Sequence, residues 1–124
     1  MRKLLNRIRR RDQRVDIDWT VRAKGGGQAI EFSGYDLSLT GIRLKGQDNA
    51  QFRQIMDEDG QTQLALHIPG HGEALWVRAS LCWGLGQPGH YTTGWHFKRP
   101  PWSVRRALAA SIRDHSTRPD VPAR

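Results

Sequence analysis

Two short polar stretches contain the residue types that bind an anionic ligand. Arg10 and Arg14 form an R-x-x-x-R motif in an arginine-rich lead. A D-x-S-x-x-G motif begins 22 positions after Arg14 and consists of Asp36, Ser38 and Gly41. An arginine fork binds phosphate oxygens, or two neighbouring acceptors on the edge of a base, through paired hydrogen bonds. The first motif therefore indicates a site for phosphate or base groups.

The second motif supplies groups that arginine lacks. Asp36 accepts hydrogen bonds, so it can hold the N–H groups of a base. Ser38 can donate to a phosphate or close the turn on its own backbone. Gly41 is expected to allow a positive φ and a close approach of the ligand to the main chain. Each motif alone is weak, because Asp, Ser and Gly are common in turns and an arginine run is usually a solvated polyanion patch.

In this order and on the strand pattern given below, the two motifs resemble those of PilZ domains, the bacterial receptor modules for cyclic di-GMP. The resemblance covers about residues 7 to 112. It implies an all-β fold, a six-stranded antiparallel β-barrel of the PilZ type followed by a C-terminal helix. It also implies a cyclic di-GMP site formed by Arg9, Arg10, Arg14, Asp36, Ser38, Gly41 and Trp83.

Arg9 bears on the number of ligand molecules. In PilZ domains, an arginine directly before the R-x-x-x-R accompanies an intercalated pair of cyclic di-GMP molecules. The resemblance therefore implies two ligands per chain, with the additional guanidinium stacked on, or hydrogen-bonded to, the second guanine.

Positive charge is concentrated at the start of the chain. The net charge is +8, and residues 1 to 14 contain seven Arg or Lys against one Asp, a local charge of +6. This placement indicates a local anion-binding device. The length of 124 residues fits one domain. A single cysteine, no apolar run near 18 residues and no apolar segment after the N-terminal charges favour a cytoplasmic protein without a membrane span.

Alternating apolar residues predict six strands, and glycines with a proline at 84–89 predict a turn. The predicted strands are 15–23, 29–35, 42–45, 63–69, 74–83 and 90–97. The stretch 47–61 is expected to be irregular, with room for a short helix. Pro101 precedes a helix that Ser103 is expected to cap and whose apolar stripe covers the barrel. The expected domains are a flexible basic lead (1–14), the barrel with its helix (15–115) and a disordered tail (116–124).

Three further side chains bear on the site. Trp83 ends the fifth predicted strand, and two interpretations stay open for it: the edge of the core, or stacking on a guanine as an aromatic near the barrel rim does in PilZ-like proteins. Arg43 and Arg78 would reinforce the site if their strands face it. Trp76 alternates with apolar neighbours, so it is expected to be exposed at a partner surface.

The sequence contains no histidine spacing typical of a metal site and no nucleophile signature, so neither an enzyme nor a cofactor is expected. The favoured function is a receptor in which cyclic di-GMP orders the lead and switches an interaction with an unknown protein effector. Two other functions are weighed: a small basic barrel that binds nucleic acid, and a ligand-independent PilZ-like adaptor. Charge located in the lead makes nucleic acid unlikely, and intact motifs disfavour the adaptor.

Overall fold

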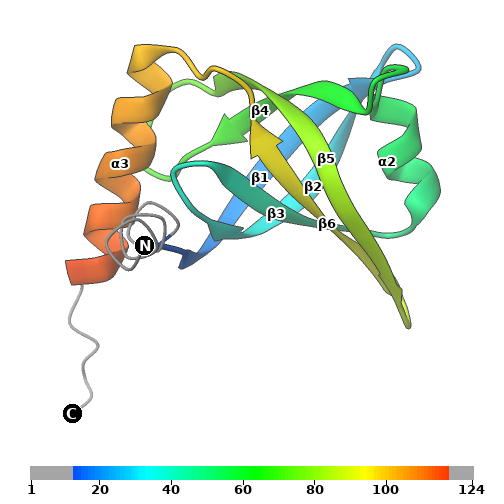
Figure 1. Cartoon of the computed structure of the whole chain (residues 1–124), viewed down its shortest axis with the longest axis horizontal. Coiled ribbons are helices and arrows are strands. Elements are labelled where there is room, and N and C mark those ends of the chain that lie inside the picture. Colours follow the sequence, from blue (N-terminus) through cyan, green and yellow to red (C-terminus); the bar gives the residue numbers. More distant parts are fainter. Residues whose placement is uncertain (1–12, 118–124) are drawn as a thin grey trace, which may run out of the picture.

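The computed structural model describes residues 13–117, in which six antiparallel strands close into a barrel with a helix at each end (Figure 1). The elements in chain order are β1 (Val15–Gly25), β2 (Gln28–Leu37), β3 (Gly41–Gly46), α2 (Asn49–Ile55), β4 (Gln61–His67), β5 (Leu75–Gln87), β6 (His90–Phe97) and α3 (Trp102–Thr117). Around the barrel the strands follow the order β1-β2-β3-β6-β5-β4, and β4 pairs with β1 to close it. The predicted all-β barrel with a C-terminal helix is confirmed.

Apolar side chains from alternate positions fill the barrel. In β1 the buried residues are Ile17, Trp19, Val21 and Ala23. Successive side chains of a strand point to opposite faces, so the residues between them face solvent. The inward face predicted for this strand is therefore the observed one.

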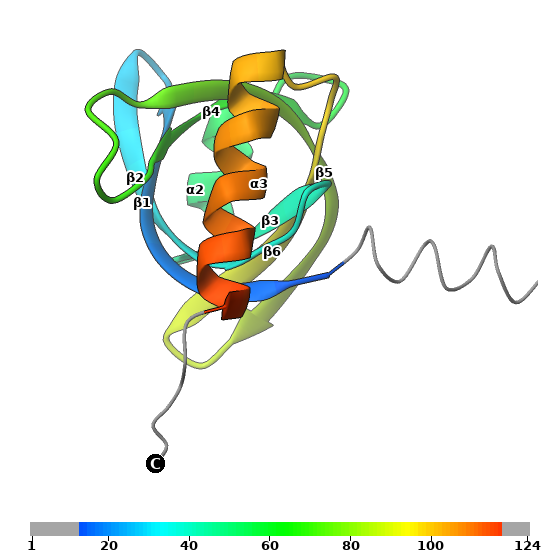
Figure 2. The same ribbon diagram turned by 90° about the vertical axis from the view of Figure 1, so that its left-hand side faces the viewer.

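The two helices cover opposite ends of the barrel. Figure 2 shows α3 lying across one end, where it buries Val104, Leu108 and Ile112. At the other end α2, in the stretch where a short helix was expected, buries Phe52 against Phe32 with ring centroids 4.5 Å apart. Each end of the apolar interior is therefore covered by a helix.

The turn expected at 84–89 is shorter than predicted. β5 continues to Gln87, and the chain reverses at Pro88 and Gly89, where Gly89 has a φ of 83°. Gly84 lies within the strand beside Tyr91, and a Cβ there would approach the Tyr91 hydroxyl to 2.7 Å. The glycine therefore makes room for a ring instead of forming a turn.

The helix α3 begins at Trp102, so Ser103 lies in its first turn and the predicted N-cap is wrong. The Arg105 N–H donates to the Pro101 carbonyl at 2.9 Å. This is the first i to i−4 hydrogen bond of the helix, and the residue that accepts it occupies the N-cap position. Pro101 is therefore the N-cap residue of α3.

Candidate functional site

Strand register places a row of residues on the outside of the barrel. Asp36 of β2 lies opposite Arg43 of β3, Arg43 lies opposite Gly94 of β6, and Gly94 lies opposite Trp83 of β5. Residues in register project to the same face of a sheet. Both neighbours of Arg43 along β3 are buried in the core, so this row faces outward. We call it the outer row.

Trp83 reaches the outer row because β5 is irregular. The register between β5 and β6 shifts between Leu81 and Trp83, where Cys82 is an additional residue. Without the shift, the period of two would give Trp83 the same inward direction as Leu81. The indole is instead 40% exposed and lies on Gly94, where a Cβ would approach its Nε1 to 2.2 Å. The ring therefore lies outside the core, and its stacking on a ligand stays a prediction.

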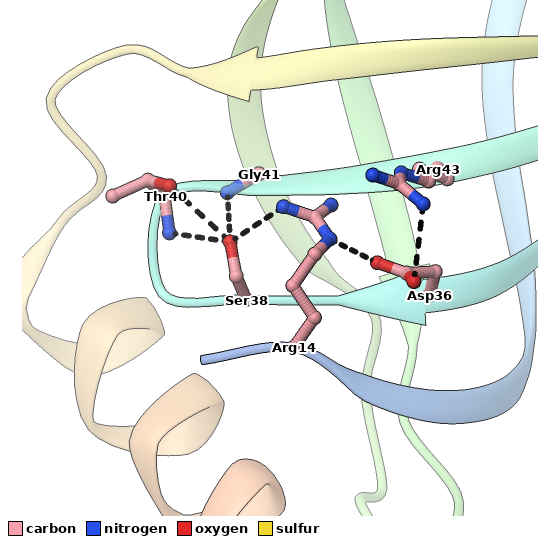
Figure 3. Close-up of polar contacts among 6 residues, drawn as sticks. All are labelled: Arg14, Asp36, Ser38, Thr40, Gly41 and Arg43. Carbon is pink, nitrogen blue, oxygen red and sulfur yellow. Dashed lines mark hydrogen bonds and ion pairs between the residues drawn. The ribbon is translucent and has the colours of Figure 1, made fainter. Parts of the chain in front are cut away.

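Arg14 joins the start of β1 to the outer row (Figure 3). Its Nε donates to Oδ1 of Asp36, and its Nη1 donates to Oγ of Ser38 at 3.4 Å. Arg43 approaches Oδ2 of Asp36 at 3.5 Å, and its guanidinium carbon lies 5.7 Å from the ring centroid of Trp83. Asp36 thus lies between two guanidinium groups, one of which is within cation–π range of an indole.

Ser38 builds the turn between β2 and β3. Its side chain is fully buried, and its Oγ accepts hydrogen bonds from the backbone N–H groups of Thr40 and Gly41, both at 3.2 Å. Its own N–H donates to the Gly41 carbonyl at 2.9 Å. Of the two roles considered for Ser38, closing the turn is the observed one. Donation to a phosphate stays a prediction.

Gly41 is required by packing between strands. Its φ is not positive, so the expected left-handed conformation is wrong. A Cβ at this position would lie 2.2 Å from the carbonyl oxygen of Trp95 on β6. Any side chain would therefore push β3 away from β6, because the obstacle is backbone and cannot rotate aside.

We expect Gly41→Ala to lower the free energy of unfolding by about 2 kcal/mol, since overpacking that shifts the backbone costs roughly 1–3 kcal/mol. Urea unfolding followed by tryptophan fluorescence measures the change. Gly72→Ala is the matched control, because within the described part of the chain nothing lies within 4 Å of a Cβ there. Equal stability of the two variants would contradict the packing role.

The structure brings together the described residues of the predicted site, which are Arg14, Asp36, Ser38, Gly41 and Trp83. Arg9 and Arg10 lie outside the described residues. Arg43 also faces the site, as its contact with Asp36 shows. Arg78 instead donates to Gln61 at 2.8 Å and pairs with Asp57 at 3.5 Å, so it does not reinforce the site.

Cys82 and His96 belong to the site but were not predicted. Both line a notch of about 130 Å³ beside Arg14, Arg43 and Trp83. The alternation of β6 contains a signal for His96, because this residue lies between two buried aromatic residues and so must face outward. The place of Cys82 beside the site depends on the irregularity in β5, which the apolar pattern does not show.

Trp76 has the exposure that was predicted. Its side chain is 49% exposed on the outside of β5, next to a groove of about 710 Å³ that Met56 and Arg78 also line. A role of Trp76 in binding a partner stays a prediction.

The side chains at the site are suited to binding a ligand through hydrogen bonds, charge and stacking. Arg14 and Arg43 offer N–H donors to phosphate oxygens or base acceptors, Asp36 offers a carboxylate to N–H groups, and Trp83 offers an aromatic face. Within residues 13–117 no cluster of His, Cys, Asp or Glu side chains is placed to hold a metal ion. In the same range no helix has the length and apolar character needed to span a membrane. The arrangement suits a planar, anionic, hydrogen-bonding ligand.

Comparison with known proteins places the chain in a family. A family model described as PilZ domain matches residues 8–114. No curated protein sequence matches the chain. Among solved structures, the PilZ domain with c-di-GMP of YcgR from Escherichia coli shares 18% identity at a TM-score of 0.66, with 87% of this chain and 92% of that chain covered.

Two longer proteins share the fold. The K. pneumonia MrkH–c-di-GMP complex shares 19% identity at a TM-score of 0.70, with 86% of this chain and 52% of that chain covered. The Bacillus subtilis inhibitor of motility (MotI/DgrA) shares 17% identity at a TM-score of 0.68, with 90% of this chain and 54% of that chain covered. The chain thus spans about half the length of these two proteins, and identities this low show the fold alone. Because the family model matches most of its length, the chain belongs to the PilZ domain family.

Proposed function

We propose that the chain is a receptor for cyclic di-GMP. The observation that carries the proposal is the outer row, in which Asp36, Arg43 and Trp83 share one face and Arg14 lies against them. Guanine has N–H donors on one edge and the acceptors O6 and N7 on another, so it needs partners of both kinds. The c-di-GMP complexes of YcgR and MrkH, which have the same fold, support this choice of ligand.

In this proposal, ligand binding breaks the contact between Arg14 and Asp36, and each side chain then binds the ligand instead. Asp36 accepts from N1–H and N2–H of a guanine, and Arg14 moves from Asp36 to the O6 and N7 edge or to a phosphate. The side chains of Arg14 and Asp36 are 27% and 14% exposed, so both are accessible to an incoming ligand. Neither charge is left unpaired by the exchange, because Asp36 gains N–H donors and Arg14 gains acceptor atoms from the ligand.

The size of the site suggests that the N-terminal lead completes it. The notch beside Arg14 measures about 130 Å³, whereas pockets that enclose a small-molecule ligand measure roughly 300–1,000 Å³. We place Arg10, and Arg9 for a second ligand molecule, over the part of the ligand that the notch leaves uncovered. Closing the lead over the ligand would change the surface offered to a protein partner, a switch based on ordering a segment.

Titration calorimetry with cyclic di-GMP tests the proposal, with cyclic di-AMP as the matched ligand. Cyclic di-AMP has the same phosphates, but adenine lacks the N1–H and N2 amine that Asp36 would hold. Micromolar or tighter binding of cyclic di-GMP with much weaker binding of cyclic di-AMP would support the receptor. Equal binding of both would indicate nonspecific anion binding. A stoichiometry near two would support the role of Arg9, and one near unity would remove it.

We expect Trp83→Ala to weaken binding of cyclic di-GMP about tenfold, because stacking of a base on an aromatic side chain contributes roughly 1–3 kcal/mol. Trp83→Phe should retain most of the affinity, since it keeps an aromatic face. Calorimetry measures both, and Trp76→Ala is the control because it removes another exposed indole from β5. An unchanged affinity in Trp83→Ala would exclude stacking.

A further inference from the structure

A groove of about 490 Å³ lies where the β2–β3 turn faces the start of α3. It is lined by Leu39, Thr40, Trp102, Arg105, Arg106 and Ala109. We call it the Leu39–Trp102 groove. Leu39 and Thr40 lie between Ser38 and Gly41, so the same turn serves the site on one side and the groove on the other. We propose that this groove docks an acidic polypeptide segment that carries an apolar anchor.

Exposed apolar side chains mark the groove as a contact surface. Trp102 is 70% exposed and Leu39 is 42% exposed, while other residues of α3 make its contact with the core. The ring of Trp102 lies 6.0 Å from the guanidinium carbon of Arg106. Tryptophan and arginine are among the residues enriched at the energetic centre of protein interfaces. A pairing of these two beside a leucine is therefore suited to hold an apolar side chain of a partner.

The positive charge of the groove favours an acidic partner. Arg105 and Arg106 lie near the start of α3, and the sequence of its first turn contains no acid. The positive end of the helix dipole disfavours cations at this place and favours anions. Among the described residues, the lining of the groove includes no carboxylate to offset them. Carboxylates of a partner would offset both arginines, whereas residues 1 to 14, with a charge of +6, are disfavoured as an occupant.

The shape of the groove favours a polypeptide over a membrane. A bilayer contacts surfaces that protrude, whereas the Leu39–Trp102 groove is a hollow between a turn and a helix. An extended or helical segment can place one side chain into such a hollow and keep its acidic residues beside Arg105 and Arg106.

The turn also gives a route for regulation, and this part rests on the proposed function. Arg14 contacts Ser38, whose hydroxyl holds the N–H groups of Thr40 and Gly41. The Thr40 carbonyl in turn accepts from Phe97 N–H at 2.8 Å. If cyclic di-GMP draws Arg14 away, the hydrogen bonds of this turn change on the side that Leu39 and Thr40 present to the groove. Ligand and partner then alter one another's affinity by the same factor.

A displayed library of random short peptides, selected on the immobilised chain with counter-selection on the bare support, tests the docking surface. We expect the selected peptides to be rich in Asp and Glu and to share a Trp, Phe or Leu. Fluorescence polarisation should then show at least about tenfold weaker binding to Trp102→Ala and to Arg105→Glu/Arg106→Glu, as for truncation of an interface hot spot. Trp76→Ala, which removes an exposed indole elsewhere, should bind as the wild type does.

Different experimental results would contradict the docking surface, the proposed function and the coupling between them. Selected peptides without acidic residues, or peptides that bind Trp102→Ala as well as the wild type, would overturn the proposal. Binding to phosphatidylcholine–phosphatidylglycerol vesicles that these variants lose, without peptide binding, would also overturn it, because the surface would then be a membrane contact. Failure of cyclic di-GMP to bind would remove the proposed function but not the docking surface. Binding of cyclic di-GMP without any change in peptide affinity would overturn the coupling alone.

Discussion

The double variant Arg10→Ala/Arg14→Ala is expected to bind cyclic di-GMP at least about a hundredfold more weakly than the wild type. One bidentate contact between arginine and guanine contributes roughly 1–3 kcal/mol, so Arg14→Ala alone should weaken binding about ten- to a hundredfold. The second arginine adds its own contribution if the two act independently. Titration calorimetry, or polarisation of a fluorescent cyclic di-GMP, measures both variants.

Two further variants separate the arginine fork from charge alone. Arg14→Lys keeps the positive charge but loses the planar fork, so we expect it to retain little of the lost affinity. Arg22→Ala is the matched control, because Arg22 lies on β1, the strand that directly follows Arg14, but pairs with Glu31 at 2.8 Å, away from the outer row. An affinity of Arg14→Ala equal to that of Arg22→Ala would contradict the role given to Arg14.

The fold was largely predictable because a barrel with one apolar interior imposes the same alternation on every strand. The predicted bounds of β6, residues 90–97, are the observed ones, and the other strands differ mainly at their ends. β5 was cut short in the prediction because its glycines were interpreted as a turn. Their observed surroundings, such as the Tyr91 ring beside Gly84, come from a neighbouring strand that local sequence cannot show.

The site was predictable in part for a topological reason. Arg14 and Asp36 are 22 positions apart but meet because β1 and β2 pair antiparallel, with Asp16 opposite Asp36. The packing that requires glycine at position 41 could not be predicted, since the atom that excludes a Cβ belongs to the backbone of β6. The direction of Trp83 depends on the additional residue in β5, and an insertion of this kind leaves no trace in the apolar pattern.

Asp36→Asn is expected to weaken binding of cyclic di-GMP about a hundredfold and to remove its preference over cyclic di-AMP. A carboxylate offers two acceptor oxygens to N1–H and N2–H of guanine, whereas an amide places an NH₂ donor against one of these donors. Hydrogen bonds to a charged group contribute about 1.5–3 kcal/mol each, so losing one of them and the charge that strengthens the other corresponds to about 3 kcal/mol. Parallel titrations with the two cyclic dinucleotides measure affinity and preference together.

The same substitution should leave the affinity for cyclic di-AMP unchanged or higher, and this contrast separates recognition of guanine from general damage to the site. Asp36 pairs with both Arg14 and Arg43 in the structure, and removing its charge leaves both guanidinium groups available to phosphates. Asp18→Asn is the control for the change in net charge, since Asp18 is exposed on β1 outside the outer row. A parallel loss of affinity for both ligands in Asp36→Asn would mean that Asp36 only holds Arg14 in place, because a residue that reads guanine must discriminate between the two bases.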